Sequence, residues 1–278
     1  MILSYLRLMR FHKPVGILLL LWPTMWALWI ASNGAPHINN IFIFVAGVIL
    51  MRAAGCVIND IVDRKLDLHV SRTRTRPIAT GEIATRSALI LFLILCMTAF
   101  ILVLFTNALT ILLAFFAVMV AIIYPFMKRY THFPQVILGI AFSFSVPMAF
   151  AAETSRVSFI AGLIMLITML WTIMYDTEYA MADREDDLKI GIKSTAIFFE
   201  KYDRAMIGLL QSVVILLLYF LGDVKHFSVI YFSAIFICLL LFIYQQMLIS
   251  KRESQNCLRA FLNNQWVGLI IFVGIFLK

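Results

Sequence analysis

The chain has 278 residues, 63% of them apolar, and a mean hydropathy of +0.96. Soluble globular domains are only about 45–50% apolar, so this composition excludes an ordinary soluble protein and indicates an integral membrane protein. The net charge of +8 is compatible with nucleic-acid binding, but the positions of the basic residues argue against that function.

Windows of about 19–20 residues predict nine apolar transmembrane segments. All should be α-helices, because the bilayer offers the backbone no hydrogen-bond partner outside its own segment. The sequence therefore predicts an all-α membrane bundle that forms a single domain over residues 1–278. The segments are 15–33, 38–58, 87–106, 108–127, 134–152, 157–182, 206–222, 226–248 and 260–277.

The lysines and arginines predict the orientation of this bundle. With the N-terminus in the cytoplasm, almost all of them lie in cytoplasmic segments, as the positive-inside rule expects. Only Arg156, Lys225 and Lys278 lie outside, and Arg52 lies within a span. The basic charge therefore reflects topology rather than a nucleic-acid partner, and the C-terminus should lie on the side opposite the cytoplasm.

The acidic residues are concentrated in two short stretches. One is NDIVDRKLD, residues 59–67, and the other is DTEYAMADREDD, residues 176–187. Each lies at the predicted cytoplasmic end of a span, the second and the sixth. Nine of the fifteen acidic residues fall in these stretches, so a functional site that uses carboxylates is expected at one face of the membrane.

Helical spacing aligns some of these side chains. Residues four apart differ by about 40° around a helix axis, and residues seven apart by about 20°. One ridge should carry Asn59, Asp63 and Asp67 if the helix continues that far, and a second should carry Asp183 and Asp187.

Two facing ridges of oxygen ligands suit Mg²⁺, which binds carboxylates, waters and phosphate oxygens. Without a cation the carboxylates would repel one another, and the helix dipole disfavours anions at a helix C-terminus. Solvated acids at the ends of spans are the simpler alternative, but two regularly spaced clusters at one face favour a metal. Asn59, Asp63, Asp67, Asp183 and Asp187 are therefore the candidate ligands of Mg²⁺.

Basic residues lie beside both acidic stretches. Arg72 follows the first, Lys193 follows the second, and Lys128 and Arg129 end the fourth span. Acids that hold a metal beside bases that bind oxygens are the arrangement of a diphosphate site. Any one of these bases, taken alone, is equally compatible with a positive-inside residue that only sets the membrane topology.

Two ionisable residues are predicted deeper in the bilayer. Arg52 precedes Asn59 by seven residues, and Asp176 precedes Asp183 by seven, so each lies about 10 Å deeper on the same helix face. A charge at this depth needs a partner or a cavity. The two residues either form a buried pair or line a reaction chamber in which Arg52 contacts an anionic acceptor.

Both acidic motifs resemble those of the intramembrane aromatic prenyltransferases of the UbiA superfamily. NDIVDRKLD matches the first family motif, NDxxDxxxD, and DREDD at residues 183–187 matches the second, DxxxD. Longer stretches resemble the members that prenylate 4-hydroxybenzoate. These stretches are RFHKPVGILLLLWPTMWAL, RAAGCVINDIVDRKLDLHVSRTRTRPIATG, YPFMKRYTHFPQ and YDTEYAMADREDDLKIGIKST.

The resemblance implies a reaction. Mg²⁺ held by both motifs would bind a polyprenyl diphosphate, and departure of diphosphate would give an allylic cation that attacks the aromatic ring ortho to the phenol. The product would be 3-polyprenyl-4-hydroxybenzoate, on the route to ubiquinone, in an inner membrane of bacterial type.

The resemblance also implies roles for the candidate residues. Catalysis is expected to rest on Asp63, Asp67, Asp183 and Asp187. Substrate binding is expected from Arg10, Lys13, Arg52, Arg72, Lys128, Arg129, Asp176 and Lys193, with the bases contacting the diphosphate and the acceptor carboxylate. Tyr124, Tyr175 and Tyr179 either stabilise the cation through their rings or simply pack.

Physical requirements point to a central cavity. Diphosphate leaves poorly unless its charge is neutralised, and an allylic cation is quenched by water unless it is shielded. A polyprenyl tail is most stable in lipid. A cavity among the helices that opens to lipid and to the cytoplasm meets all these needs.

Other functions remain compatible with the sequence. A related enzyme with homogentisate, a naphthoate or a haem precursor as acceptor would keep the same motifs. A secondary transporter also buries charges between helices, although its sites usually lie near the middle of the membrane. A scaffold without activity would leave the acidic stretches unexplained.

Overall fold

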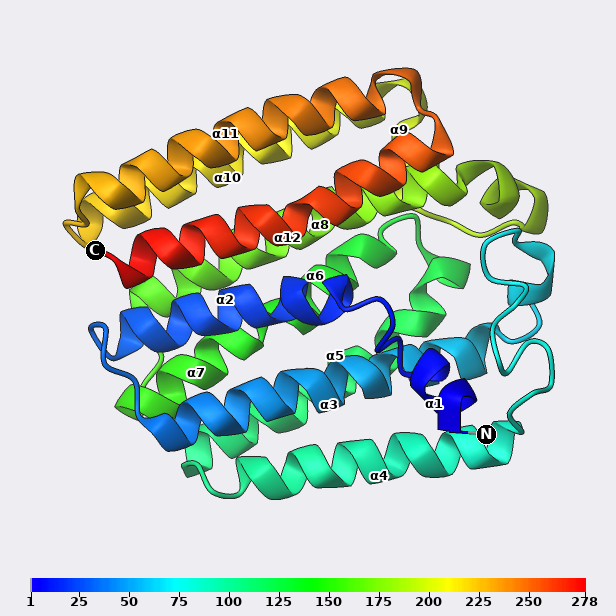
Figure 1. The fold of residues 1–278 in the computed structure, drawn as a ribbon, viewed down its shortest axis with the longest axis horizontal. Helices are drawn as coiled ribbons and strands as arrows, with labels where there is room; N and C mark the ends of the chain where they lie inside the picture. The colour runs from blue at the N-terminus through cyan, green and yellow to red at the C-terminus, as the bar shows by residue number, and fades with distance from the viewer. Residues whose placement is uncertain (1) are drawn as a thin grey trace.

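The computed structural model describes residues 2–278, and within them it contains helices and no strand. The long helices run side by side, and the described N-terminus and the C-terminus lie at opposite ends of the bundle (Figure 1). The helices are α1 Ile2–Leu8, α2 Val15–Ala31, α3 Ile38–Asp63, α4 Thr85–Val103, α5 Ala108–Tyr130, α6 Pro134–Ser143, α7 Ser145–Thr154, α8 Phe159–Ile190, α9 Thr195–Phe199, α10 Asp203–Val224, α11 Val229–Leu248 and α12 Ser254–Phe276, with short 3₁₀ turns η1 Asp67–His69, η2 Glu200–Tyr202 and η3 Ile249–Lys251.

Within residues 2–278, 8 helical segments are long and apolar enough to cross a membrane, with α6 and α7 counted as one. A further apolar helix, α2, has 17 residues, which is near the lower limit for a span. These segments occupy the nine positions that the sequence predicts. The prediction of an all-α membrane bundle is therefore confirmed.

Two helices run further than the hydropathy pattern predicts. α3 continues to Asp63 and α8 continues to Ile190, beyond the predicted ends at residues 58 and 182. A hydropathy window ends where charges begin, whereas these charged turns remain helical because their side chains face a cavity. The two extensions carry most of the acidic motif residues.

The fifth span is broken at Phe144, between α6 and α7. Pro147 has no backbone N–H, so it cannot continue the hydrogen-bond ladder of α6. At the break, the hydroxyl of Ser143 donates to the carbonyl of Ile140 at 3.0 Å and that of Ser145 donates to the carbonyl of Phe142 at 3.1 Å. The backbone satisfies both hydroxyl groups, so neither needs a partner in the apolar surroundings.

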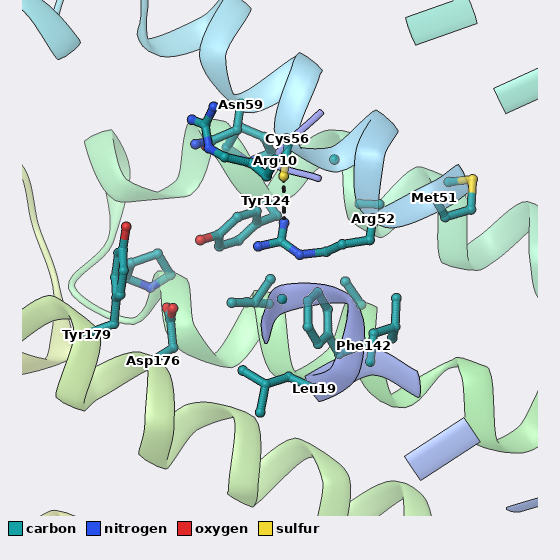
Figure 2. Close-up of a pocket in the computed structure, with 18 of the residues that line it drawn as sticks. Arg10, Leu19, Met51, Arg52, Cys56, Asn59, Tyr124, Phe142, Asp176 and Tyr179 are labelled. Carbon is teal, nitrogen blue, oxygen red and sulfur yellow. Dashed lines mark hydrogen bonds between the residues drawn. The ribbon is translucent and has the colours of Figure 1, made fainter. Parts of the chain in front are cut away.

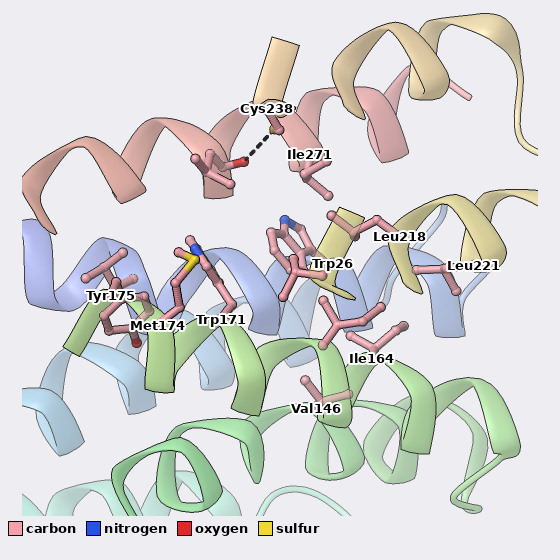
Figure 3. Close-up of a cluster of buried hydrophobic side chains, with 14 of the residues drawn as sticks. Trp26, Val146, Ile164, Trp171, Met174, Tyr175, Leu218, Leu221, Cys238 and Ile271 are labelled. Carbon is pink, nitrogen blue, oxygen red and sulfur yellow. Dashed lines mark hydrogen bonds between the residues drawn. The ribbon is translucent and has the colours of Figure 1, made fainter. Parts of the chain in front are cut away.

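A buried core cluster joins α2, α8 and α12 (Figure 3). The rings of Trp26 and Trp171 stack with their centroids 5.4 Å apart. Trp26 donates to the carbonyl of Gly268 at 3.0 Å, and a Cβ at Gly268 would overlap the rings of Trp22 and Trp171. Small residues at such crossings let membrane helices approach closely, so this core holds α8 rigidly.

On the opposite side of the bundle the helices pack unevenly. α4 packs along α3, whereas α5 packs against α6 and α7 and makes few contacts with α4. A space is therefore left between the α3–α4 pair and the rest of the bundle, and it holds the candidate site.

Candidate active site

One large cavity, with a volume of about 920 Å³, occupies this space. Its wall is formed by α2 to α8 and α12, together with the segments before α2, after α3 and after α8. The cavity wall includes every predicted site residue except Arg129: Arg10, Lys13, Arg52, Asn59, Asp63, Asp67, Arg72, Lys128, Asp176, Asp183, Asp187 and Lys193. The structure thus brings both acidic motifs and their neighbouring bases to a single site.

The first motif does not lie on one continuous helix. α3 ends at Asp63, and Asp67 begins the 3₁₀ turn η1. The expected ridge therefore holds for Asn59 and Asp63, while Asp67 reaches the cavity from a separate turn. Asp63 and Asp67 are both buried, with 1% and 5% of their surface exposed.

The segment after α3 links the two motifs. Arg72 donates from Nε and Nη2 to the two carboxylate oxygens of Asp183, at 2.9 and 2.5 Å. Its guanidinium carbon lies 4.5 Å from the centroid of the Tyr179 ring. The backbone N–H of Ser71 donates to Asp186 at 2.9 Å. The two motifs, more than a hundred residues apart in sequence, are therefore held together.

Arg76 joins the carboxylates of the first motif. It donates to both oxygens of Asp67 at 2.9 Å and lies 3.1 Å from Asp60. Asp60 also accepts from Arg10 at 2.8 and 3.0 Å. Burial works against the charge of Arg76, but Asp60 and Asp67 raise its pKa above the ordinary value, so Arg76 stays protonated. Arg10 is thus engaged with a protein carboxylate, although it also borders the cavity.

Bases at the end of α5 contact the same motif. Lys128 donates to Oδ2 of Asp63, and Arg129 donates to the carbonyl of Val62 at 2.7 Å. The backbone N–H of Lys193 donates to the carbonyl of Lys128 at 3.0 Å, which joins the segment after α8 to α5. The polar mouth of the cavity, which comprises both acidic motifs and these bases, therefore draws on α3, α5 and α8.

The donor set fits Mg²⁺. Oδ1 of Asp63 is buried and has no hydrogen-bond partner within residues 2–278, and no hydrogen bond of the described residues uses the side chains of Asn59 or Asp187. In the same part of the chain, no three His, Cys, Asp or Glu side chains converge as a complete metal site. Mg²⁺ usually takes only one or two carboxylates and completes its shell with water and phosphate oxygens, so this partial set matches its chemistry.

Lys13 adds positive charge to the mouth of the cavity. Burial and the neighbouring Arg72 and Arg10 lower the pKa of Lys13 below the ordinary lysine value. Such repulsion among cations is relieved when an anion binds between them, so this side of the mouth favours an anionic ligand.

Deeper in the cavity, Arg52 has no acidic partner within 4 Å among the described residues. Its Nη1 donates to Sγ of Cys56 at 3.2 Å, and its guanidinium carbon lies 5.9 Å from the centroid of the Phe142 ring. Figure 2 shows the guanidinium pointing towards Tyr124, with Asp176 further away across the cavity. Of the two alternatives, the structure therefore favours residues that line a chamber over a buried ion pair.

The remainder of the wall is apolar and opens sideways. On α4 it includes Met97 and Phe100, which are 56% and 45% exposed, and on α5 it includes Phe115, which is 62% exposed. Ala117 and Ala121 on α5 lie between these bulky residues and the polar mouth. In a bilayer, surface exposed on this face contacts lipid, so the cavity opens to the membrane between α4 and α5.

Sequence reasoning missed several contributors to the site. Arg76 was visible as a base beside the first motif, but its links to Asp60 and Asp67 depend on how the following segment folds back. Cys56, Phe142 and Gly16 carry no motif, and only their neighbours in space reveal them.

Comparison with known proteins agrees with this geometry. Residues 20–270 match the UbiA prenyltransferase family. Two curated relatives are named 4-hydroxybenzoate octaprenyltransferase. The one from Coxiella burnetii is 54% identical over 273 residues, covering 98% of this chain and 95% of the relative. The one from Hahella chejuensis is 54% identical over 274 residues, covering 99% and 91%.

Solved structures share the fold at lower sequence identity. A UbiA homolog from Aeropyrum pernix K1 matches with a TM-score of 0.82 at 22% identity, covering 94% of this chain and 97% of the other. A UbiA homolog from Archaeoglobus fulgidus, bound to GPP and Mg²⁺, matches with a TM-score of 0.75 at 16% identity, covering 99% and 100%.

The chain therefore belongs to the UbiA prenyltransferase family. The family and the enzyme class that the two aspartate motifs predict are confirmed, and the protein is a multi-pass membrane protein.

Proposed function

We propose that this enzyme transfers a polyprenyl group from polyprenyl diphosphate to the ring of 4-hydroxybenzoate, with Mg²⁺ as cofactor. The observation that carries the proposal is a single cavity with aspartates and bases at its mouth and an apolar opening towards lipid. The names of the relatives at 54% identity supply the acceptor.

The polar mouth serves the diphosphate. Asn59, Asp63, Asp67, Asp183 and Asp187 would hold Mg²⁺, which neutralises the charge of the leaving group. Arg72, Lys128 and Lys193 line the same wall, and Arg129 lies beside it, so their cations can contact the diphosphate oxygens. In a site sheltered from water, such charge stabilisation is usually the largest part of catalysis.

Arg52, deeper in the cavity, serves the acceptor. The guanidinium of Arg52 has no acidic partner in the described chain and faces the cavity, so it can bind the benzoate carboxylate. Lys13 also borders the cavity, whereas Arg10 is already bound to Asp60. The aromatic acid would then lie between Arg52 and the polar mouth, with its ring near Tyr124.

The apolar part serves the polyprenyl chain. The opening between α4 and α5 lets a tail longer than the cavity extend into the bilayer. Lipid is a favourable environment for such a tail, because each CH₂ group kept from water stabilises it by about 0.8 kcal/mol.

The reaction breaks the bond between C1 of the polyprenyl group and the diphosphate oxygen. A carbon–carbon bond forms at the ring position ortho to the hydroxyl, and the proton of that ring carbon is released. The products are diphosphate and 3-polyprenyl-4-hydroxybenzoate, an intermediate of ubiquinone biosynthesis. Tyr124, Tyr175 and Tyr179 border the cavity, where their rings can stabilise the allylic cation.

The proposed location is the inner membrane of a bacterium, with the polar mouth and the N-terminus on the cytoplasmic side. The distribution of lysines and arginines supports this orientation.

Purified enzyme provides the test. Incubation with 4-hydroxybenzoate, octaprenyl diphosphate and Mg²⁺ should yield the ring-prenylated product, and EDTA should stop its formation until Mg²⁺ is restored. Prenylation of homogentisate or of a naphthoate in preference to 4-hydroxybenzoate would contradict the proposed acceptor. Equal activity with EDTA would contradict the metal.

A further inference from the structure

We propose that Gly16, on the first turn of α2, is a positioning residue that holds the guanidinium of Arg52 in place for the carboxylate of the acceptor. The inference rests on the proposed function, in which Arg52 binds that carboxylate. Neither the acidic motifs nor any polar group of Gly16 points to this role. It follows from the space that a missing side chain leaves.

A side chain added at Gly16 would overlap the guanidinium of Arg52. A Cβ built there would stand 2.5 Å from both Nε and Nη2 of Arg52 and 2.9 Å from Cζ. Contacts this short do not occur in folded proteins, so a side chain at position 16 and the present position of the guanidinium exclude each other. Gly16 also borders the cavity.

The backbone of α2 thus contacts one side of the Arg52 guanidinium. Cys56 on α3 accepts from Nη1, and the Phe142 ring on α6 lies 5.9 Å from the guanidinium carbon. The Nε atom is buried without a hydrogen-bond partner in residues 2–278, as a group covered by a helix backbone would be. Three helices therefore hold the guanidinium that points into the cavity. Only glycine at position 16 lets α2 approach it this closely.

Two other glycines that border the cavity do not show this feature. An added Cβ at Gly47 or Gly55, both on α3, would meet nothing within 4 Å. Gly16 also has a backbone conformation that is accessible to any residue, so its value lies in the space it leaves rather than in its own flexibility.

The consequence concerns the acceptor alone. A methyl group at position 16 would push the end of the Arg52 side chain away, while the helix itself would tolerate alanine well. A misplaced guanidinium loses the paired hydrogen bonds that it can make to a carboxylate. The polyprenyl diphosphate, bound at the polar mouth, should not sense the change.

The test compares Gly16→Ala, Gly47→Ala and Arg52→Gln in purified enzyme with saturating polyprenyl diphosphate and Mg²⁺. Gly16→Ala should raise KM for 4-hydroxybenzoate by about tenfold, the loss of roughly one charge-assisted hydrogen bond, with KM for the diphosphate unchanged. Gly47→Ala should keep the wild-type KM for 4-hydroxybenzoate. With 4-hydroxybenzamide, an acceptor without the carboxylate, Gly16→Ala and wild type should react alike.

The double variant Gly16→Ala/Arg52→Gln separates the possible failures. If the two residues act together, the double variant has the same KM for 4-hydroxybenzoate as Arg52→Gln alone. Additive effects, or a normal KM in Gly16→Ala while Arg52→Gln is impaired, would overturn the role of Gly16 and leave the proposed function intact. A normal KM in Arg52→Gln would overturn the acceptor site itself.

A folding defect in Gly16→Ala is also informative. If the overlap with Arg52 is its cause, shortening the side chain in Gly16→Ala/Arg52→Gln restores the yield of folded protein. A defect that persists in the double variant means that Gly16 meets some other group, and the proposal then fails.

Discussion

Each carboxylate at the polar mouth has a basic partner or a free oxygen, and this division defines its expected role. Asp183 is held by Arg72 and Asp63 by Lys128, while Oδ1 of Asp63 has no hydrogen-bond partner within the described residues and lies 4.0 Å from Arg129. These contacts hold the two carboxylates in place in the absence of substrate. When diphosphate binds, the same bases are in place to contact its oxygens.

This arrangement predicts a large effect of neutral isosteres. Asp63→Asn and Asp183→Asn should each lower kcat/KM by about a hundredfold or more, because each loses a charge where the leaving group is neutralised. The protein should accumulate in the membrane at near-normal levels. Product formation is measured by chromatography after extraction of the membranes.

Asp186→Asn is the matched control. Asp186 belongs to the same DREDD motif but accepts from the backbone of Ser71 and does not border the cavity, and asparagine can accept the same hydrogen bond. Its activity should stay within about threefold of wild type. If all three variants lose activity equally, the division between cavity-facing and structural acids is wrong.

At the scale of the elements, the gap between α4 and α5 decides where a long tail can go. Ala117 lines the cavity on α5, whereas Ile122, on the same helix, is 40% exposed and does not line it. The two positions therefore separate an effect on the passage from an effect on the helix.

Ala117→Phe should narrow this passage. Turnover of octaprenyl diphosphate should fall by about fivefold to a hundredfold, since overpacking costs about 1–3 kcal/mol, while geranyl diphosphate should react nearly as before. Ile122→Phe should leave both rates unchanged. Equal losses with the short and the long substrate would show that the tail does not leave between α4 and α5.

A second group of elements is joined by one buried carboxylate. Asp203, at the start of α10, is fully buried and accepts from Arg184 on α8 and from Arg252 before α12. These interactions tie the ends of three helices close to the second acidic motif. Arg252 has a left-handed backbone conformation, with φ of 55°.

Asp203→Ala should lower the free energy of unfolding by about 2–4 kcal/mol, because it leaves two arginines without their shared partner. Both arginines are partly exposed, so water reduces the loss compared with a fully buried pair. Denaturation in detergent measures the change. Asp223→Ala, at an exposed position on the same helix, should change the free energy of unfolding by less than about 0.5 kcal/mol. An equal loss in both variants would contradict a stabilising role for the contacts of Asp203 with the two arginines.

At the scale of the whole molecule, much of the architecture was predictable because hydropathy and charge are local properties. The nine apolar stretches became helices, and the residue spacing in NDIVDRKLD and DREDD identified the site. What remained hidden depends on contacts between distant segments. Arg76 reaches Asp60 only because the segment after α3 folds back, and the break at Phe144 depends on Pro147 inside an otherwise uninterrupted apolar run.

The distribution of basic residues predicts the orientation of the bundle. Alkaline phosphatase fused after Lys278 should be active, and a green fluorescent protein fused there should be dark, since an odd number of crossings places the C-terminus opposite the cytoplasm. A fusion at residue 132, between α5 and α6, should give the reverse pattern. Cytoplasmic behaviour of the C-terminal fusion would contradict the proposed orientation.

The two openings of the cavity separate the fates of the products. Diphosphate can return only to the aqueous phase beside Asp63 and Asp187, where its bulk concentration governs how strongly it competes with new substrate. The prenylated product can leave sideways past Met97 and Phe115 into the membrane. Its concentration per unit area of membrane then governs how strongly it competes with new substrate. Hydrolysis of diphosphate in the aqueous phase should therefore relieve inhibition by the first product. Added lipid, which dilutes the prenylated product, should relieve inhibition by the second.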